Sequence, residues 1–288
     1  MTRLQRGFTL VELIVVMVVM GILAGILVVF FTPALNNYFA TSRRASLSDV
    51  ADGAMRKMSR DIRSSVPNSV RSWGNTCLET VPTSGGGRYR TAPDTVWDST
   101  HAGAAVTQPV QPGFSFSSFD AVTDVNAVRG DWLVIGNQNT SDVYAGVNRG
   151  LIDTVTASAF PQLGRSRVTL QANMQAPAGY DGARFVIVPR AQGPVSFVCQ
   201  NPGIDAVTGT GTGTLFRVSN YNFAEPGSCP VTGANTPVLA TRVSACSFNY
   251  EPNPGATQES GYVEVDLTLT DSNEFVRLRF GVHVDNVP

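Results

Sequence analysis

The apolar run from Phe8 to Phe31 constrains this chain more than any other feature of its sequence. The run contains 24 residues and one charged side chain, Glu12. An α-helix of that length is about 36 Å long at roughly 1.5 Å per residue, and the hydrocarbon core of a bilayer is about 30 Å thick. We therefore expect residues 8–31 to span a membrane once, with some tilt.

A secretory signal peptide and a plain membrane anchor are the simplest explanations of this run. A signal peptide has an apolar region of about 7–15 residues that ends at a small-x-small site, but this run is longer and ends in Val-Val-Phe-Phe-Thr-Pro. Glu12 argues against both, because a carboxylate inside a membrane helix costs on the order of 2.5–3.5 kcal/mol. A cut between Gly7 and Phe8 would create an amine beside Glu12, and this amine would supply a countercharge within the chain or to a neighbour.

The sequence Arg6-Gly7-Phe8-Thr9-Leu10-Val11-Glu12 resembles the processing site of type IV prepilins and type II secretion pseudopilins. The resemblance implies that residues 1–7 are a leader and that a prepilin peptidase cuts between Gly7 and Phe8. It further implies that the new N-terminus at Phe8 is methylated and that Glu12 is the carboxylate used in fibre assembly. The implied partners are this peptidase, other major and minor pilins, and the assembly platform of the inner membrane.

The helix that follows is also similar to that family, with one departure. Gly21-Ile22-Leu23-Ala24 looks like part of the family's apolar helix, but the proline that many pilins have just after it is Val29 here. A proline comes later, at Pro33.

Beyond Pro33, apolar side chains recur at spacings of three and four residues, which is the pattern of an amphipathic helix. Pro67 ends the pattern, because the residue before a proline is pushed out of the helical region. We expect a second helical half over residues 34–66, with its apolar stripe packed on a sheet. The stripe comprises Leu47, Val50, Ala51, Ala54, Met55, Met58, Ile62 and Val66.

The remainder, residues 67–288, is expected to form a globular β-rich domain outside the cytoplasm. Residues 261–270 and 274–284 alternate apolar and polar side chains with period two around Asp271-Ser272-Asn273, which predicts a terminal hairpin. Arg277 and Arg279 are expected to pair across this hairpin with Asp266 and Glu264. Residues 68–112 are rich in Gly, Pro, Ser and Thr and are expected to be a long loop with one or two short strands. The expected fold is α+β and pilin-like, a long N-terminal helix packed on an elaborated antiparallel sheet.

Four cysteines in strand-like settings indicate disulfides and an oxidising compartment. They allow three pairings. We favour Cys199–Cys246, which leaves Cys77–Cys229, and a local Cys229–Cys246 bond is the second choice. Arginines flank the apolar run on both sides, so the positive-inside rule does not decide its orientation. The cysteines favour a cytoplasmic N-terminus.

Composition argues against several functions. The chain has 21 basic and 22 acidic residues, so no nucleic-acid partner is expected. Its two histidines, His101 and His283, exclude a His-rich metal site, and no nucleophile–base motif stands out. The alternating Thr and Gly of residues 208–214 precede a strand-like segment, so they indicate a hairpin tip and not a phosphate loop. We expect neither a cofactor nor an enzymatic activity.

The order of elements in the globular part resembles the larger minor pilins of the PilW and GspJ types. The Gly86–Arg90 and His283–Pro288 stretches are most similar to the MshO-type minor pilins of the MSHA pilus. This resemblance implies a minor type IV pilin, bound to the inner membrane by one span and later assembled in a pilus in the periplasm or on the cell surface. The domain is bulky, so a place at or near the tip or in an initiating complex is expected. The alternatives are a type II secretion minor pseudopilin and a pilin-anchored adhesin whose site includes Trp73, Trp97 or Trp132.

Overall fold

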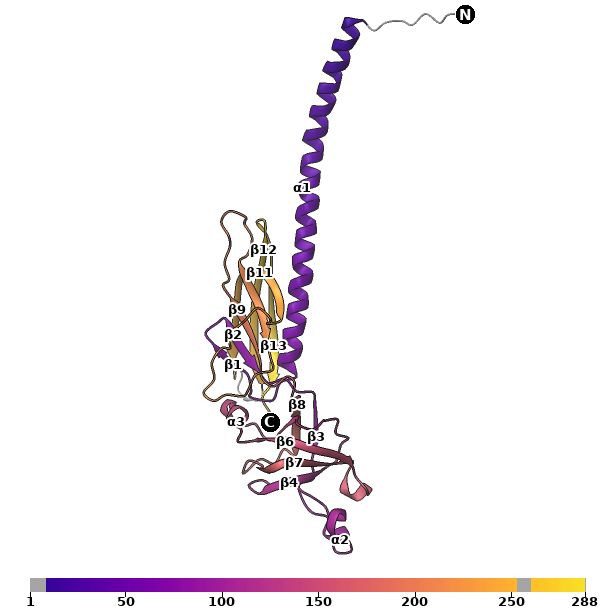
Figure 1. Ribbon diagram of the computed structural model, residues 1–288, viewed down its shortest axis with the longest axis vertical. Coiled ribbons are helices and arrows are strands. Elements are labelled where there is room, and N and C mark those ends of the chain that lie inside the picture. The colour runs from indigo at the N-terminus through magenta and orange to yellow at the C-terminus, as the bar shows by residue number, and fades with distance from the viewer. Residues whose placement is uncertain (1–8, 253–259, 288) are drawn as a thin grey trace, which may run out of the picture.

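A computed structural model describes residues 9–252 and 260–287 of the chain. It contains one long helix, α1 (Leu10–Arg63), and two antiparallel sheets (Figure 1). The predicted α+β fold, in which a long N-terminal helix packs on an antiparallel sheet, is confirmed. At roughly 1.5 Å per residue, the 54 residues of α1 extend about 81 Å.

Local hydrogen bonds explain where α1 begins and ends. Thr9 is the N-cap, and its hydroxyl accepts a hydrogen bond from the backbone N–H of Glu12 at 3.3 Å. Pro33 lies inside the helix and does not end it. At the other end, the helix stops at Arg63 and not at the expected residue 66, because the N–H of Val66 donates to the carbonyl of Val81 at 2.8 Å. Pairing with a neighbouring segment therefore replaces the last helical turn.

The first sheet has seven strands and carries α1 on one face. Its order is β1-β2-β9-β10-β11-β12-β13. The predicted terminal hairpin is confirmed, with a two-residue loop at Ser272 and Asn273, whose φ angles of 51° and 67° are those of a type I′ turn. The strands are β1 (Arg71–Trp73), β2 (Cys77–Thr80), β9 (Val195–Gln200), β10 (Gly213–Val218), β11 (Val238–Glu251), β12 (Ser260–Asp271) and β13 (Glu274–Asp285).

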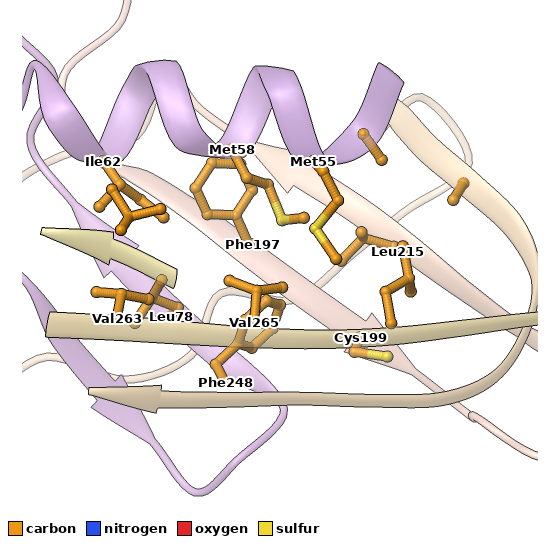
Figure 2. Close-up of a cluster of buried hydrophobic side chains, with 14 of the residues drawn as sticks. Met55, Met58, Ile62, Leu78, Phe197, Cys199, Leu215, Phe248, Val263 and Val265 are labelled. Carbon is orange, nitrogen blue, oxygen red and sulfur yellow. The ribbon is translucent and has the colours of Figure 1, made fainter. Parts of the chain in front are cut away.

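The core of this part lies between α1 and the first sheet. In Figure 2, Met55, Met58 and Ile62 point from the helix toward Phe197 and Val265 on the strands. The amphipathic stripe predicted for α1 is present, but Val50 is 40% exposed. At 100° per residue, Val50 lies on the flank of the stripe centred on Ala51, Ala54 and Met58. Its apolar character reflects that border position.

One buried charge fixes the helix to the sheet. The Asp61 side chain is 5% exposed and lies 2.7 Å from the Nε of Arg217 on β10, and 3.1 Å from the Nζ of Lys57. Asp61 precedes Ile62, which belongs to the apolar stripe. The ion pair of Asp61 with Arg217 was not predicted from the sequence. A carboxylate is tolerated at this depth because both cations surround it.

Residues 81–194 form the second sheet, inserted between the adjacent strands β2 and β9. Its six strands are ordered β3-β8-β5-β6-β7-β4, and its own core includes Phe119, Leu133, Ile152 and Phe185. The expectation of one β-rich domain over residues 67–288 therefore omitted a division into two sheets. The elements are β3 (Gly85–Arg88), α2 (Thr95–Asp98), η1 (Gly103–Ala105), β4 (Ser115–Ala121), β5 (Trp132–Val134), α3 (Thr140–Ala145), β6 (Arg149–Ala157), η2 (Pro161–Leu163), β7 (Ser166–Gln175) and β8 (Arg184–Val188).

The second sheet extends the molecule at the end of the first sheet that is remote from the start of α1 (Figure 1). The loop expected over residues 68–112 is not continuous, because it contains β1, β2, β3 and α2. These elements have three or four residues each, so their alternation is too short to detect in the sequence.

Aromatic and charged side chains join the two sheets. Glu79 of β2 is 1% exposed and is ion-paired with Arg71 of β1. The guanidinium of Arg71 lies 3.5 Å from the ring centroid of Tyr144 in α3, whose hydroxyl donates to the Ser69 carbonyl at 2.7 Å. Burial, followed by the charge of Glu79, raises the pKa of Tyr144. The hydroxyl therefore remains a donor at this junction.

Candidate functional site

The first thirty residues of α1 present an apolar surface that the rest of the chain does not cover. Residues 9–39 are all exposed. Within the described residues, α1 is the one helix long and apolar enough to cross a membrane, and its most apolar 18-residue window has a mean hydropathy of 3.2. A continuous apolar surface of this size is covered by lipid or by other protein chains in the functional state.

Glu12 lies at the beginning of this surface. It occupies the first turn of α1, three residues after the N-cap Thr9, where its N–H is held by the Thr9 hydroxyl. A carboxylate in the first turn is stabilised by the positive end of the helix dipole. The described part of the chain gives the Glu12 carboxylate no ion pair, so it is available to a cationic group from outside the helix. Gly7 and Phe8, the expected cleavage pair, lie outside the described residues.

The cysteines occupy two places. Cys77 of β2 and Cys229 form a disulfide with an S–S distance of 2.08 Å, across a sequence separation of 152 residues. The bond ties the first sheet to the loop between β10 and β11. Cys199 and Cys246 are thiols, so the bond favoured between them is not formed in this structure. The Cys199 thiol, followed by burial, raises the pKa of the Cys246 thiol. Both side chains belong to the core between α1 and the first sheet, Cys199 buried and Cys246 partly buried.

The remaining candidate residues do not meet in one place. Arg277 pairs with Asp266, and Arg279 lies 3.1 Å from Glu264, as predicted for the terminal hairpin. Trp73 belongs to β1, Trp132 to β5, and Trp97 to α2, where its ring stacks on His101 with centroids 3.6 Å apart. In residues 9–252 and 260–287 there is no cluster of three or more metal-ligating side chains.

Comparisons with known proteins agree with the properties of the N-terminal segment. The family described as "Prokaryotic N-terminal methylation motif" matches residues 2–28. The type IV major fimbrial protein FimA of Dichelobacter nodosus is 40% identical over 63 residues, which are 22% of this chain and 37% of that protein. A fimbrial protein of the same organism has the same identity and coverage. The chain thus matches little more than a third of the length of these curated relatives. No solved structure matches the chain.

Proposed function

This chain is a type IV pilin-like protein that carries the prepilin methylation motif, and we propose that it is a minor pilin of an MSHA-type pilus. In this proposal a prepilin peptidase removes residues 1–7 and methylates Phe8. The apolar half of α1 holds the protein in the inner membrane, with the N-terminus in the cytoplasm, until the assembly platform transfers it into the fibre. Glu12 then meets the N-terminal amine of a neighbouring pilin.

The observation that carries the minor role is the position of the second sheet. Residues 81–194 extend beyond the end of the first sheet that is remote from the membrane-embedded start of α1 (Figure 1). In a fibre of parallel subunits, that end faces the next subunit outward from the membrane. An extra sheet there occupies the space in which an identical copy would stack. This supports a place at or near the tip, or in the complex that initiates the fibre.

The N-terminus of the mature protein tests the processing step. We expect intact mass and tandem mass spectrometry of protein from purified pili to give a chain that begins at N-methylated Phe8. A Gly7→Arg variant should keep Met1 and remain in the membrane, because the substituted side chain blocks the bond to be cut. A wild-type chain that begins at Met1 would contradict the proposal and leave an anchored domain with an unexplained Glu12.

The position in the fibre is tested by immunogold electron microscopy with an antibody against residues 81–194. The proposal predicts label at fibre ends and a low copy number relative to the major pilin. Label along the whole shaft would overturn it. Deletion of the gene distinguishes the second candidate, a type II secretion pseudopilin: loss of pili supports the proposed role, whereas loss of enzyme export with pili intact supports the secretion role.

We also propose that Cys199 and Cys246 form a second disulfide after export. Both lie on strands of the first sheet, where Cys199 belongs to the core beneath α1 and Cys246 packs against that core. Each thiol loses one hydrogen, and the two electrons reduce an oxidised disulfide partner by thiol–disulfide exchange. Alkylation of the denatured, unreduced exported protein should label no cysteine, and a Cys246→Ser variant should be labelled once, at Cys199. Labelling of both cysteines in the wild-type protein would show that they remain thiols.

A further inference from the structure

A cavity of about 400 Å³ lies at the junction of the two sheets. Its volume falls within the roughly 300–1,000 Å³ of small-molecule sites, which occur preferentially where domains meet. The second sheet contributes Trp132 and Gln171, and the connection after β10 contributes Asn220, Asn222 and Phe223. Neither sheet alone would form this cavity.

The two aromatic side chains that line the cavity contact each other and one arginine. The rings of Trp132 and Phe223 meet edge to face, with centroids 5.6 Å apart. The guanidinium of Arg149 lies 4.4 Å from the first ring and 4.3 Å from the second, and its Nε donates to the Val143 carbonyl at 2.7 Å. These contacts fix both rings before any ligand arrives, which lowers the entropy lost on binding.

The polar part of the lining consists of amides and one cation. Asn220 and Asn222 each offer a carbonyl oxygen and an NH₂ group, so they pair with hydroxyl groups as either donor or acceptor. Gln171 donates one hydrogen bond to the Ile152 carbonyl at 3.2 Å and keeps its carbonyl oxygen and its second N–H for a ligand. Arg190 also lines the cavity, and it takes part in none of the ion pairs found in the described part of the chain. The nearby Asp131 is occupied by the backbone N–H groups of Val128 and Arg190, at 2.9 Å each. No carboxylate lines the cavity, which disfavours a cationic ligand.

We propose that this cavity binds an acidic saccharide, one that bears a carboxylate. The rings of Trp132 and Phe223 can pack against the apolar C–H face of a sugar, and the three amides can form hydrogen bonds with its hydroxyl groups. Arg190 can bind a carboxylate through bidentate, charge-assisted hydrogen bonds. This inference does not depend on the proposed position in a pilus. It assigns the junction of the two sheets as a recognition site whichever fibre or membrane carries the domain.

Binding of full-length, detergent-solubilised protein to an array of oligosaccharides tests the proposal. The array pairs uronic-acid and sialic-acid oligosaccharides with their methyl esters and with neutral counterparts. We expect binding to acidic members and loss of binding to the esters. For the best acidic member, Arg190→Gln should raise the Kd about tenfold or more, the usual effect of removing one charged hydrogen-bond partner. No binding to any acidic member, or equal binding to acids and esters, would overturn the proposal.

Two further variants separate binding from folding. Arg129→Gln is the matched control, because Arg129 is 76% exposed, pairs with Asp153 and does not line the cavity; it should leave the Kd unchanged. Asn222→Ala removes an exposed amide from the lining and should weaken binding without changing the circular dichroism spectrum. If Arg129→Gln and Arg190→Gln weaken binding equally, general surface charge explains the attraction and the assigned cavity is wrong.

Discussion

Replacing Glu12 by alanine is expected to leave cleavage after Gly7 intact and to abolish incorporation of the protein into the fibre. The variant helix keeps its Thr9 cap, because that hydrogen bond uses the backbone N–H of Glu12 and not its carboxylate. It loses the negative charge that a neighbour's N-terminal amine would need in an apolar setting, where an unpaired charge is costly. The measurement is the ratio of mature protein in sheared pili to mature protein in the membrane fraction.

Two controls make the Glu12 result specific. Glu12→Gln keeps the size and polarity of the side chain and should fail as completely as alanine, since only the charge has been removed. Asp52→Ala removes a carboxylate from the exposed face of the same helix, where it pairs with Arg56 at 2.7 Å, and should assemble normally. Normal incorporation of Glu12→Ala would refute the charge-pair argument.

Replacing Asp61 by alanine is expected to lower the free energy of unfolding by about 3–5 kcal/mol, the usual cost of removing one partner of a buried ion pair. Arg217 would keep its charge with its side chain only 13% exposed and without the carboxylate 2.7 Å away. The contact joins α1 to β10, so its loss should loosen the helix from the sheet. Urea denaturation of the detergent-solubilised chain, followed by tryptophan fluorescence, gives the change.

The comparison for Asp61 comes from the same helix. Asp52→Ala should change the stability by only about 0–1 kcal/mol, because both Asp52 and Arg56 are largely exposed. A double variant, Asp61→Leu with Arg217→Met, removes both charges and should recover most of the loss. If Asp61→Ala is no more destabilising than Asp52→Ala, the ion pair does not hold the helix to the sheet.

The parts of the fold that the sequence predicted well are those with long uninterrupted patterns. The terminal hairpin alternates over residues 261–270 on one side of its turn and 274–284 on the other, and both its register and its cross-strand ion pairs follow from that alternation. The stripe of α1 is equally regular. The division of residues 67–288 into two sheets left no such signal, because a strand pattern does not show which sheet the strand joins, and β1, β2 and β3 have only three or four residues each.

The candidate sites also differ in how far they can be predicted from the sequence. The residues from Gly7 to Glu12 are consecutive in the chain, so the motif that they form can be recognised in the sequence without knowledge of the fold. The cavity brings Trp132 together with Phe223, ninety-one positions further along the chain, and only the packing of the two sheets makes them neighbours. Asp61 was missed for a related reason, since Arg217 lies 156 positions away.

The insertion point of the second sheet has a consequence for which part of the chain can vary. β2 and β9 are antiparallel neighbours with Thr80 opposite Val195, so the chain leaves the first sheet and returns to it at adjacent positions. The segment between them is an insertion, because β2 pairs directly with β9 and the order of the first sheet includes no strand from residues 81–194. The length and chemistry of the inserted segment can therefore change without moving the two positions at which it joins the first sheet.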